Sequence, residues 1–239
     1  MAKYIHLLKT EQSFIDKYYG EEYLEPWVSL TDTENAHVNY NKRMATVDLG
    51  LPSGNLWAAY NLGASSSAES GDFYAWAELE PKTSYLEETY KYYDSQTGDF
   101  TKYFSGDSNR ALLPEDDAAT VKLGGGWQVP TKEDFDELIE NCNYTSYTEG
   151  DFTYLKLTSN INGKSIVFLN TGAKIDSGVT SSEYFYLWAA NDLYDQCTSP
   201  TYNRANILRG SAMYPGLEIN VYNRVYGLQI RPVLKTGNQ

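Results

Sequence analysis

The composition of this 239-residue chain excludes several classes of protein. Hydrophobic residues make up 41% and charged residues 21%, which is typical of a globular protein, and the length suits one sizeable core with a small appendage. The formal net charge of −13, with no Lys/Arg cluster to interrupt it, argues against nucleic-acid binding because phosphates would be repelled.

The first part of the chain, residues 1–45, differs in pattern from the rest. Thr10 can cap a short helix over Glu11–Tyr19, which Gly20 would end. The residues from there to Leu49 have the β-branched and aromatic content of extended segments, which would pair either with the main domain or with neighbouring copies of the chain. We therefore predict an N-terminal attachment or oligomerisation segment over residues 1–45.

The chain carries no export or membrane signal in its hydropathy pattern. The opening residues, MAKYIHLLKTEQ, contain no apolar stretch of the length that a signal peptide needs, and no apolar run is long enough to span a membrane. We expect synthesis in the cytoplasm and no membrane insertion.

Residues 46–239 have the pattern of one domain with few helices and many short strands. Pro114 followed by the three carboxylates of residues 115–117 is typical of a first helical turn, because acidic side chains favour the positive end of the helix dipole. A calcium site made by the same carboxylates is the alternative. The clearest helix spans Lys132–Cys142, with Thr131 as N-cap, Asp134 at the third position and an apolar face of helical period.

The later strands follow a period of two. Residues 153–157 alternate in polarity, and Asn162-Gly163 is a strong hairpin signal before the apolar run 166–169. A second hairpin is predicted from residues 217–222 and 228–231, around Asn223-Arg224. Early helices followed by late antiparallel strands indicate an α+β fold class.

A run of three glycines, residues 124–126, precedes Trp127. The run lacks the Lys and Ser/Thr of a phosphate-binding loop, so we interpret it as a tight turn that brings Trp127 into the core. Cys142 and Cys197 are too few for a disulfide framework, and two histidines give no cluster at zinc-site spacing. We interpret both cysteines as buried free thiols and expect no metal and no cofactor.

Four stretches together carry a family resemblance. They are VDLGLPSGNLWAAYNLGA at 47–64, GDFYAWAELEPK at 71–82, PEDDAATVKLGGGWQVPT at 114–131 and YGLQIRPV at 226–233. This pattern resembles the major paralogous domain of gut-dwelling anaerobes and their phages, a branch of the C-type-lectin-like fold related to the formylglycine-generating enzyme. The motifs MAKYIH and EPWVS resemble the leading segment of phage structural proteins.

The resemblance implies a C-type-lectin-like fold, with two helices around a twisted antiparallel sheet, over most of residues 46–239. The short N-terminal helix and extended attachment segment would precede it. The resemblance also implies a C-terminal surface that varies on a fixed scaffold. In phage members of the fold, a reverse-transcriptase system that randomises adenine-containing codons can diversify that surface. Trp188, Gly227 and Pro232 would belong to the scaffold.

The candidate ligand-binding residues share the Tyr, Asn and Asp palette of such a surface. Tyrosine offers a large and rigid contact, while Asn and Asp supply adaptable hydrogen bonds, as in antibody paratopes. The alternative interpretation is that they are ordinary strand and turn residues. The candidates are Asn191, Asp192, Tyr194, Asp195, Tyr202, Asn203, Asn206, Tyr214, Asn220, Tyr222 and Asn223.

These observations favour a non-enzymatic receptor-binding virion protein, either a fibre tip or a capsid decoration. Its variable face would bind a bacterial cell-surface protein or glycan, and its N-terminal segment would bind other virion proteins. Homotrimeric or other multivalent display would strengthen a weak single contact. Two alternatives remain: a purely structural virion component, and an enzyme related to sulfatase-modifying factors with Cys197 as nucleophile.

Overall fold

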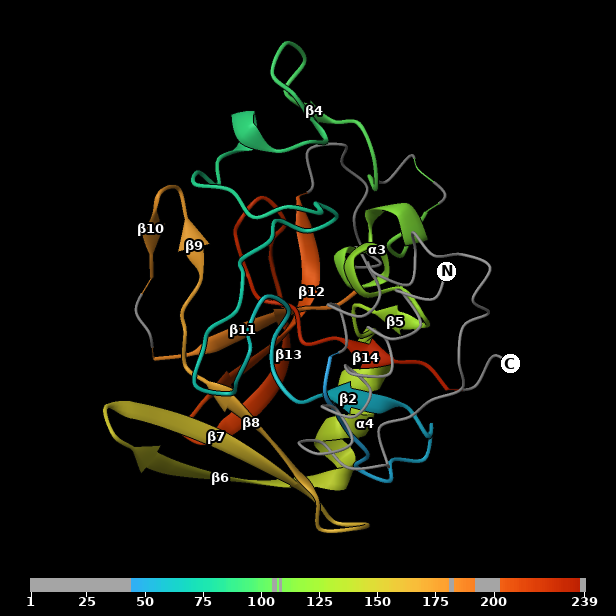
Figure 1. Cartoon of the computed structure of the whole chain (residues 1–239). Coiled ribbons are helices and arrows are strands. Elements are labelled where there is room, and N and C mark those ends of the chain that lie inside the picture. Colours follow the sequence, from blue (N-terminus) through green and yellow to red (C-terminus); the bar gives the residue numbers. More distant parts are fainter. Residues whose placement is uncertain (1–43, 105–106, 108, 181–182, 192–202, 237–239) are drawn as a thin grey trace, which may run out of the picture. The chain divides into compact units, whose positions relative to one another are not determined.

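A computed structural model describes residues 44–104, 107, 109–180, 183–191 and 203–236 (Figure 1). These residues belong to the second of the two units into which the chain divides, residues 42–239. The expected helix at 11–19, the attachment segment up to residue 43 and Cys197 lie outside the described residues.

The described part of the chain is built from five small sheets, and every pair of neighbouring strands in them is antiparallel. The four-stranded sheet has the strand order β1 (Thr46–Val47), β2 (Leu56–Ala58), β14 (Val233–Leu234) and β5 (Trp127–Gln128). One three-stranded sheet consists of β11 (Phe185–Trp188), β12 (Arg204–Ser211) and β13 (Gly216–Asn223), and the other of β6 (Cys142–Glu149), β7 (Phe152–Ser159) and β8 (Ser165–Leu169). The two-stranded sheets are β3 (Tyr93–Asp94) with β4 (Asp99–Phe100), and β10 (Gly178–Val179) with β9 (Lys174–Ile175). The five sheets are joined by long irregular connections (Figure 1).

Helices contribute little to this part of the chain. The α-helices are α3 (Ala118–Leu123) and α4 (Lys132–Asn141), and the 3₁₀ turns are η2 (Glu87–Thr89) and η3 (Pro114–Asp116). The predicted α+β class, with two helices around one twisted antiparallel sheet, is therefore wrong: the described residues are predominantly β, in several small sheets. None of the described helices is long and apolar enough to cross a membrane.

Helix α4 begins and is capped as its sequence predicts. The Thr131 hydroxyl accepts a hydrogen bond from the Asp134 N–H, and the Asp134 carboxylate accepts one from the Thr131 N–H. This capping box satisfies two N–H groups that a helix start leaves unpaired. Phe135 and Leu138 are fully buried on the apolar face. The helix ends one residue earlier than predicted, because Cys142 is extended and opens β6.

Two local turns also follow the sequence. Asn162 accepts a hydrogen bond from the Lys164 N–H in the turn between β7 and β8, as the Asn-Gly signal predicts. Residues 124–126 all have positive φ, which favours glycine, and Trp127 directly after them is only 8% exposed. The glycine run is therefore a turn that places Trp127 in the core.

The predicted C-terminal hairpin is wrong. Strand β13 pairs along its whole length with β12, from Arg204 opposite Asn223 to Ser211 opposite Gly216. Leu228 instead exchanges two backbone hydrogen bonds with Tyr74, at 2.8 and 3.0 Å. Residues 228–231 alternate in polarity, whereas β12 has the adjacent apolar residues Ile207 and Leu208, so periodicity favoured the wrong partner.

The β11–β12–β13 sheet separates two hydrophobic clusters. Tyr186, Trp188, Ala205 and Ile207 lie in the first cluster, while Phe185, Leu187 and Leu208 lie in the second, which also contains Phe135 and Leu138 of α4. Successive strand residues point to opposite faces, so one short sheet contributes to both clusters. The sheet is consequently held by packing from both sides.

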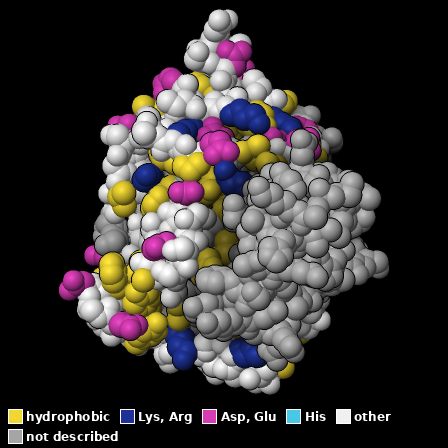
Figure 2. All heavy atoms as spheres, viewed as in Figure 1, with side chains coloured by type: hydrophobic (Ala, Val, Ile, Leu, Met, Phe, Trp, Pro, Cys, Tyr) yellow, Lys and Arg dark blue, Asp and Glu magenta, His cyan; other side chains and the backbone are white. Residues whose placement is uncertain are grey.

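Charges of both signs lie next to each other on the surface. Figure 2 shows basic and acidic side chains side by side on the upper part of the visible face. Several of the described charged side chains form ion pairs, among them Lys122 with Glu80 and Lys91 with Asp116. An exposed pair such as Lys122 with Glu80 contributes little stability, whereas the Asp116 carboxylate is buried.

Candidate ligand-binding surface

Four tyrosine rings lie in contact along one face of the β11–β12–β13 sheet. The ring centroids are 6.2 Å apart for Tyr184 and Tyr186, 5.2 Å for Tyr186 and Tyr222, and 5.4 Å for Tyr222 and Tyr226. These separations are typical of favourable aromatic pairs. We call these four residues the tyrosine row.

Strand geometry explains why these rings meet. Tyr184 and Tyr186 are two residues apart, so they project from the same side of the chain at β11. Across the sheet, Tyr222 lies opposite Ala205, whose small side chain leaves room above β12. Tyr186 is 8% exposed, while the other three rings are partly exposed. The row thus has a buried centre and accessible flanks.

An ion pair borders the row. The Arg209 guanidinium lies 4.8 Å from the centroid of the Tyr184 ring and also pairs with the Glu218 carboxylate. In the strand register, Arg209 lies opposite both Tyr186 and Glu218. The cation–π contact and the ion pair hold the guanidinium beside the aromatic surface.

The two central hydroxyls of the row, those of Tyr186 and Tyr222, are protonated at physiological pH. Burial raises the pKa of the Tyr186 and Tyr222 hydroxyls above the ordinary value near 10, and neighbouring tyrosines raise it further. Each hydroxyl therefore stays protonated and can both donate and accept a hydrogen bond. The surface offers flat apolar area with polar ends, which suits contact with proteins or sugars.

The predicted ligand-binding residues are divided among several places. Asp192, Tyr194, Asp195 and Tyr202 lie outside the described residues. Tyr222 belongs to the tyrosine row, and the exposed Asn220 lies two residues before it on the same side of β13. These two are the predicted residues that the structure brings together.

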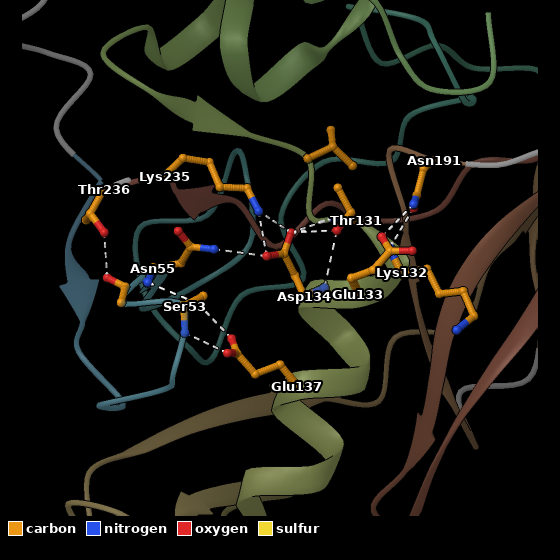
Figure 3. A network of polar contacts seen from close by, with 12 residues as sticks. Ser53, Asn55, Thr131, Lys132, Glu133, Asp134, Glu137, Asn191, Lys235 and Thr236 are labelled. Carbon is orange, nitrogen blue, oxygen red and sulfur yellow. Dashed lines mark hydrogen bonds and ion pairs between the residues drawn. The ribbon is translucent and has the colours of Figure 1, made fainter. Parts of the chain in front are cut away.

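Two of the predicted asparagines are committed to internal contacts near the start of α4 (Figure 3). Asn191 accepts a hydrogen bond from the Lys132 N–H at 2.6 Å and donates one to the Glu133 carboxylate at 2.6 Å. Asn206 is only 8% exposed and donates to the Asn191 carbonyl. Both side chains therefore stabilise the scaffold in this structure.

The same network fixes the rest of the helix start. The Asp134 carboxylate accepts hydrogen bonds from Asn55 at 3.0 Å and from Lys235 at 2.5 Å, and Glu137 accepts two from Ser53 at 2.7 Å (Figure 3). The Glu137 carboxylate thereby joins α4 to a loop distant in sequence. Acidic residues near a helix N-terminus also favour the helix dipole.

The remaining predicted residues lie at opposite ends of the β12–β13 hairpin. Tyr214 is 66% exposed in the connection between the strands. Asn203 and Asn223 lie at the other end, where Asn203 donates to Glu87 and Asn223 accepts from the Val225 N–H. Since the strands have eight residues each, the two ends are about 24 Å apart. Tyr214 therefore belongs to a different surface.

Sequence reasoning missed three tyrosines and one arginine of this site. Tyr184, Tyr186, Tyr226 and Arg209 were not among the candidates. The alternation of Tyr184 and Tyr186 around Phe185 was a usable signal for two rings on one side of a strand. The contact of Tyr226 depends on the turn after β13, which local pattern did not reveal.

The acidic run at 115–117 has a structural role. Asp116 is 2% exposed, and its carboxylate accepts hydrogen bonds from the Tyr103 hydroxyl at 2.8 Å, from Lys91 at 3.1 Å, and from Lys102 and the Tyr92 hydroxyl. Burial alone would raise the pKa of Asp116, but these donors outweigh it and lower the pKa to about 2.

The Asp117 carboxylate caps α3 by accepting from the Thr120 N–H, and it also accepts from the Val129 N–H beyond the helix. Oxygens that the calcium alternative required are thus occupied by protein donors. Among the described residues, no group of three or more His, Cys, Asp and Glu side chains is arranged to hold a metal ion.

Cys142 is buried and unpaired with another cysteine, as predicted for a free thiol. Burial raises the pKa of its thiol to about 11, so the nucleophilic thiolate is scarce at neutral pH. The scaffold assignments also hold: Trp188 is 1% exposed and Pro232 is buried.

Comparison of the chain with protein-family models, with curated proteins and with solved structures gave no match. The resemblance of the four stretches to the major paralogous domain therefore stays a prediction.

Proposed function

We propose that the protein is a non-enzymatic ligand-binding component of a virion, a fibre tip or capsid decoration. It would contact a protein or glycan on a bacterial surface through the tyrosine row. The single observation that carries this proposal is the continuous contact of four tyrosine rings, three of them partly exposed, on a sheet packed from both sides. A rigid aromatic surface loses little conformational freedom on binding.

The virion assignment rests on the resemblance of four stretches and of the N-terminal motifs to phage and gut-bacterial proteins. Partners within the virion would bind the segment 1–45, and display of several copies, as in a homotrimer, would raise the avidity of each weak face. The proposed binding surface differs from the Tyr/Asn surface predicted from sequence. It keeps Tyr222 and adds Tyr184, Tyr186 and Tyr226, while most of the other described candidates lie elsewhere.

The test uses purified full-length protein on a glycan array and on a panel of anaerobic gut bacteria. Replacing Tyr184 and Tyr226 together by Ala removes two partly exposed rings and leaves the buried Tyr186 in place. We expect this variant to bind at least about ten-fold more weakly, since two aromatic contacts are each worth about 1 kcal/mol or more. Tyr144→Ala and Tyr147→Ala, on exposed rings of β6, are matched controls.

Equal loss in the β6 controls would reject the row as the binding surface. Failure of the parent protein to bind any array spot or any cell would favour the purely structural virion component instead. Thermal unfolding of each variant separates lost contact from lost fold.

A further inference from the structure

A second surface feature lies away from the sheet interior, in a groove of about 500 Å³. Its walls come from five segments that are distant in sequence: residues 70–73, residues 151–153 at the β6–β7 turn, residues 169–171, strand β10, and the connection between β12 and β13. Phe152 is 47% exposed, Val179 55% and Met213 54%, and all three line the groove. Large apolar side chains from separate segments that converge on one groove are typical of a binding site.

The surface around the groove combines apolar and acidic character. Figure 2 shows hydrophobic side chains gathered over the β6–β7 hairpin at the lower left, with acidic side chains beside them. Glu149 and Asp151 flank the tip of this hairpin, and both are exposed. Within the described part of the chain, the Asp151 carboxylate has no hydrogen-bond or ion-pair partner.

Most polar groups of the groove are already engaged. The Asn170 amide donates to the Glu183 carbonyl at 2.8 Å and accepts from the Ala212 N–H at 3.1 Å. The Thr171 hydroxyl donates to the Gln229 side chain at 2.9 Å. A sugar ring needs several free donors and acceptors, because each hydroxyl that it buries unpaired costs free energy. The groove therefore suits an apolar ligand with one or two positive charges better than a neutral sugar.

We propose that this groove binds an extended segment of a partner protein in which apolar side chains alternate with or adjoin Lys or Arg. Apolar side chains of the segment pack between Phe152, Val179 and Met213, and a cationic side chain pairs with Asp151. The net charge of −13 attracts such a segment over a long range and opposes a second copy of this chain. None of the residues that line the groove belongs to the tyrosine row, but the Thr171 N–H in the groove wall donates a hydrogen bond to the Tyr184 carbonyl at 3.2 Å. The proposal does not depend on the function of the row.

The test measures binding of short capped peptides by fluorescence anisotropy. The probe has the sequence Lys-Leu-Thr-Leu-Thr-Lys, and matched peptides carry Gln or Glu in place of both lysines. We expect the lysine peptide to bind most tightly and the Glu peptide most weakly. Val179→Ser combined with Met213→Ser should weaken binding of the lysine peptide by at least about ten-fold, the equivalent of roughly 1.4 kcal/mol.

Two further substitutions separate charge from apolar contact. Asp151→Asn should weaken binding of the lysine peptide several-fold and leave binding of the Gln peptide unchanged. It should also reduce the dependence of lysine-peptide binding on salt concentration. Ile161→Ser removes an apolar side chain that is 54% exposed and outside the groove, and it should have no effect. Glu88→Gln, on an exposed carboxylate in η2, is the matched charge control.

Three outcomes would overturn the proposal. Equal loss of binding in Ile161→Ser or Glu88→Gln would show non-specific attraction. Binding of a neutral oligosaccharide in the groove, with no binding of any of the peptides, would assign the groove to sugars. Concentration-dependent self-association of the parent in sedimentation, abolished by the Val179 and Met213 substitutions, would assign it to a second copy. Because these side chains are about half exposed, circular dichroism should show an unchanged fold in every variant.

Discussion

The ring of Tyr222 stacks on the ring of Tyr186, with centroids 5.2 Å apart and planes 23° from parallel. This contact joins the two outer strands of the β11–β12–β13 sheet across its central strand. Tyr222 also packs against the hydrophobic cluster that contains Trp188 and Ile207. It is therefore both a scaffold residue and a surface residue.

Tyr222→Ala should lower the free energy of unfolding by about 2 kcal/mol, because it removes the stacking and part of the core contact. Tyr222→Phe keeps the ring and should remain within about 0.5 kcal/mol of the parent. Urea unfolding followed by tryptophan fluorescence measures both. Tyr214→Ala, at a 66% exposed ring, is the control, and an equal loss there would contradict the assigned role of Tyr222.

Asp116 should make stability depend on pH in the acidic range. Its folded-state pKa of about 2 lies below the unfolded value near 4, so its contribution is fully present above pH 4 and is lost as the pH falls toward 2. The shift corresponds to about 2 kcal/mol. Urea unfolding at several pH values between 2 and 6 measures it.

Asp116→Asn is the matching variant. It should lower the free energy of unfolding at pH 7 by about 2–4 kcal/mol, because Lys102 and Lys91 lose their carboxylate partner. It should also make the loss of stability between pH 4 and pH 2 smaller than in the parent protein. A variant that kept the full acid dependence of the parent would show that other carboxylates cause it.

Asn191→Ala tests whether this predicted binding residue supports the start of α4 instead. The substitution leaves the Lys132 N–H without its Asn191 acceptor and removes one of the donors to the Glu133 carboxylate. The free energy of unfolding should fall by about 1–2 kcal/mol in thermal or urea unfolding. Asn220→Ala, on exposed β13, should change it by less than about 0.5 kcal/mol. The reverse ranking would return Asn191 to the binding surface.

Gly227→Ala tests a close approach in the scaffold. A Cβ atom at Gly227 would lie 2.6 Å from the ring of Tyr85, which is fully buried. Overpacking of this kind costs about 1–3 kcal/mol, seen as a lowered urea midpoint. Gly178→Ala, where the nearest atom lies 3.9 Å away, should leave the midpoint unchanged. Equal midpoints for the two variants would mean that the Tyr85 ring moves freely.

Local features of the fold were predictable from sequence because short-range chemistry determines them. The α4 capping box depends on residues three apart, and the β7–β8 turn depends on Asn162 and Gly163. The partner of β13 was not predictable, because residues 228–231 alternate in polarity and β12, the actual partner, does not. The close approach of β11 to β12 depends on Gly210, where a Cβ would lie 2.3 Å from the Phe185 ring.

The candidate site was predicted less well than the helices and turns. Composition drew attention to Tyr and Asn in the last part of the chain, and it located Tyr222 and Asn220. It could not distinguish Asn191, which supports a helix, from Asn220, which faces outward, since both are polar residues near strands. Tyr222 lies opposite Ala205 on β12, whereas Tyr186 lies opposite Arg209, so the two rings meet diagonally across β12, and register is a long-range property.

Strand β14 has a consequence for how the protein is made. It pairs with β2 through Val233 and Trp57 and with β5 through Val233 and Gln128, so a segment near residue 234 fills the middle of a sheet begun near residue 46. A chain still attached to the ribosome exposes the edges of β2 and β5 until β14 emerges. The four-stranded sheet must therefore close after translation has passed residue 234, and shielding of those edges by chaperones during synthesis should raise the yield of folded protein.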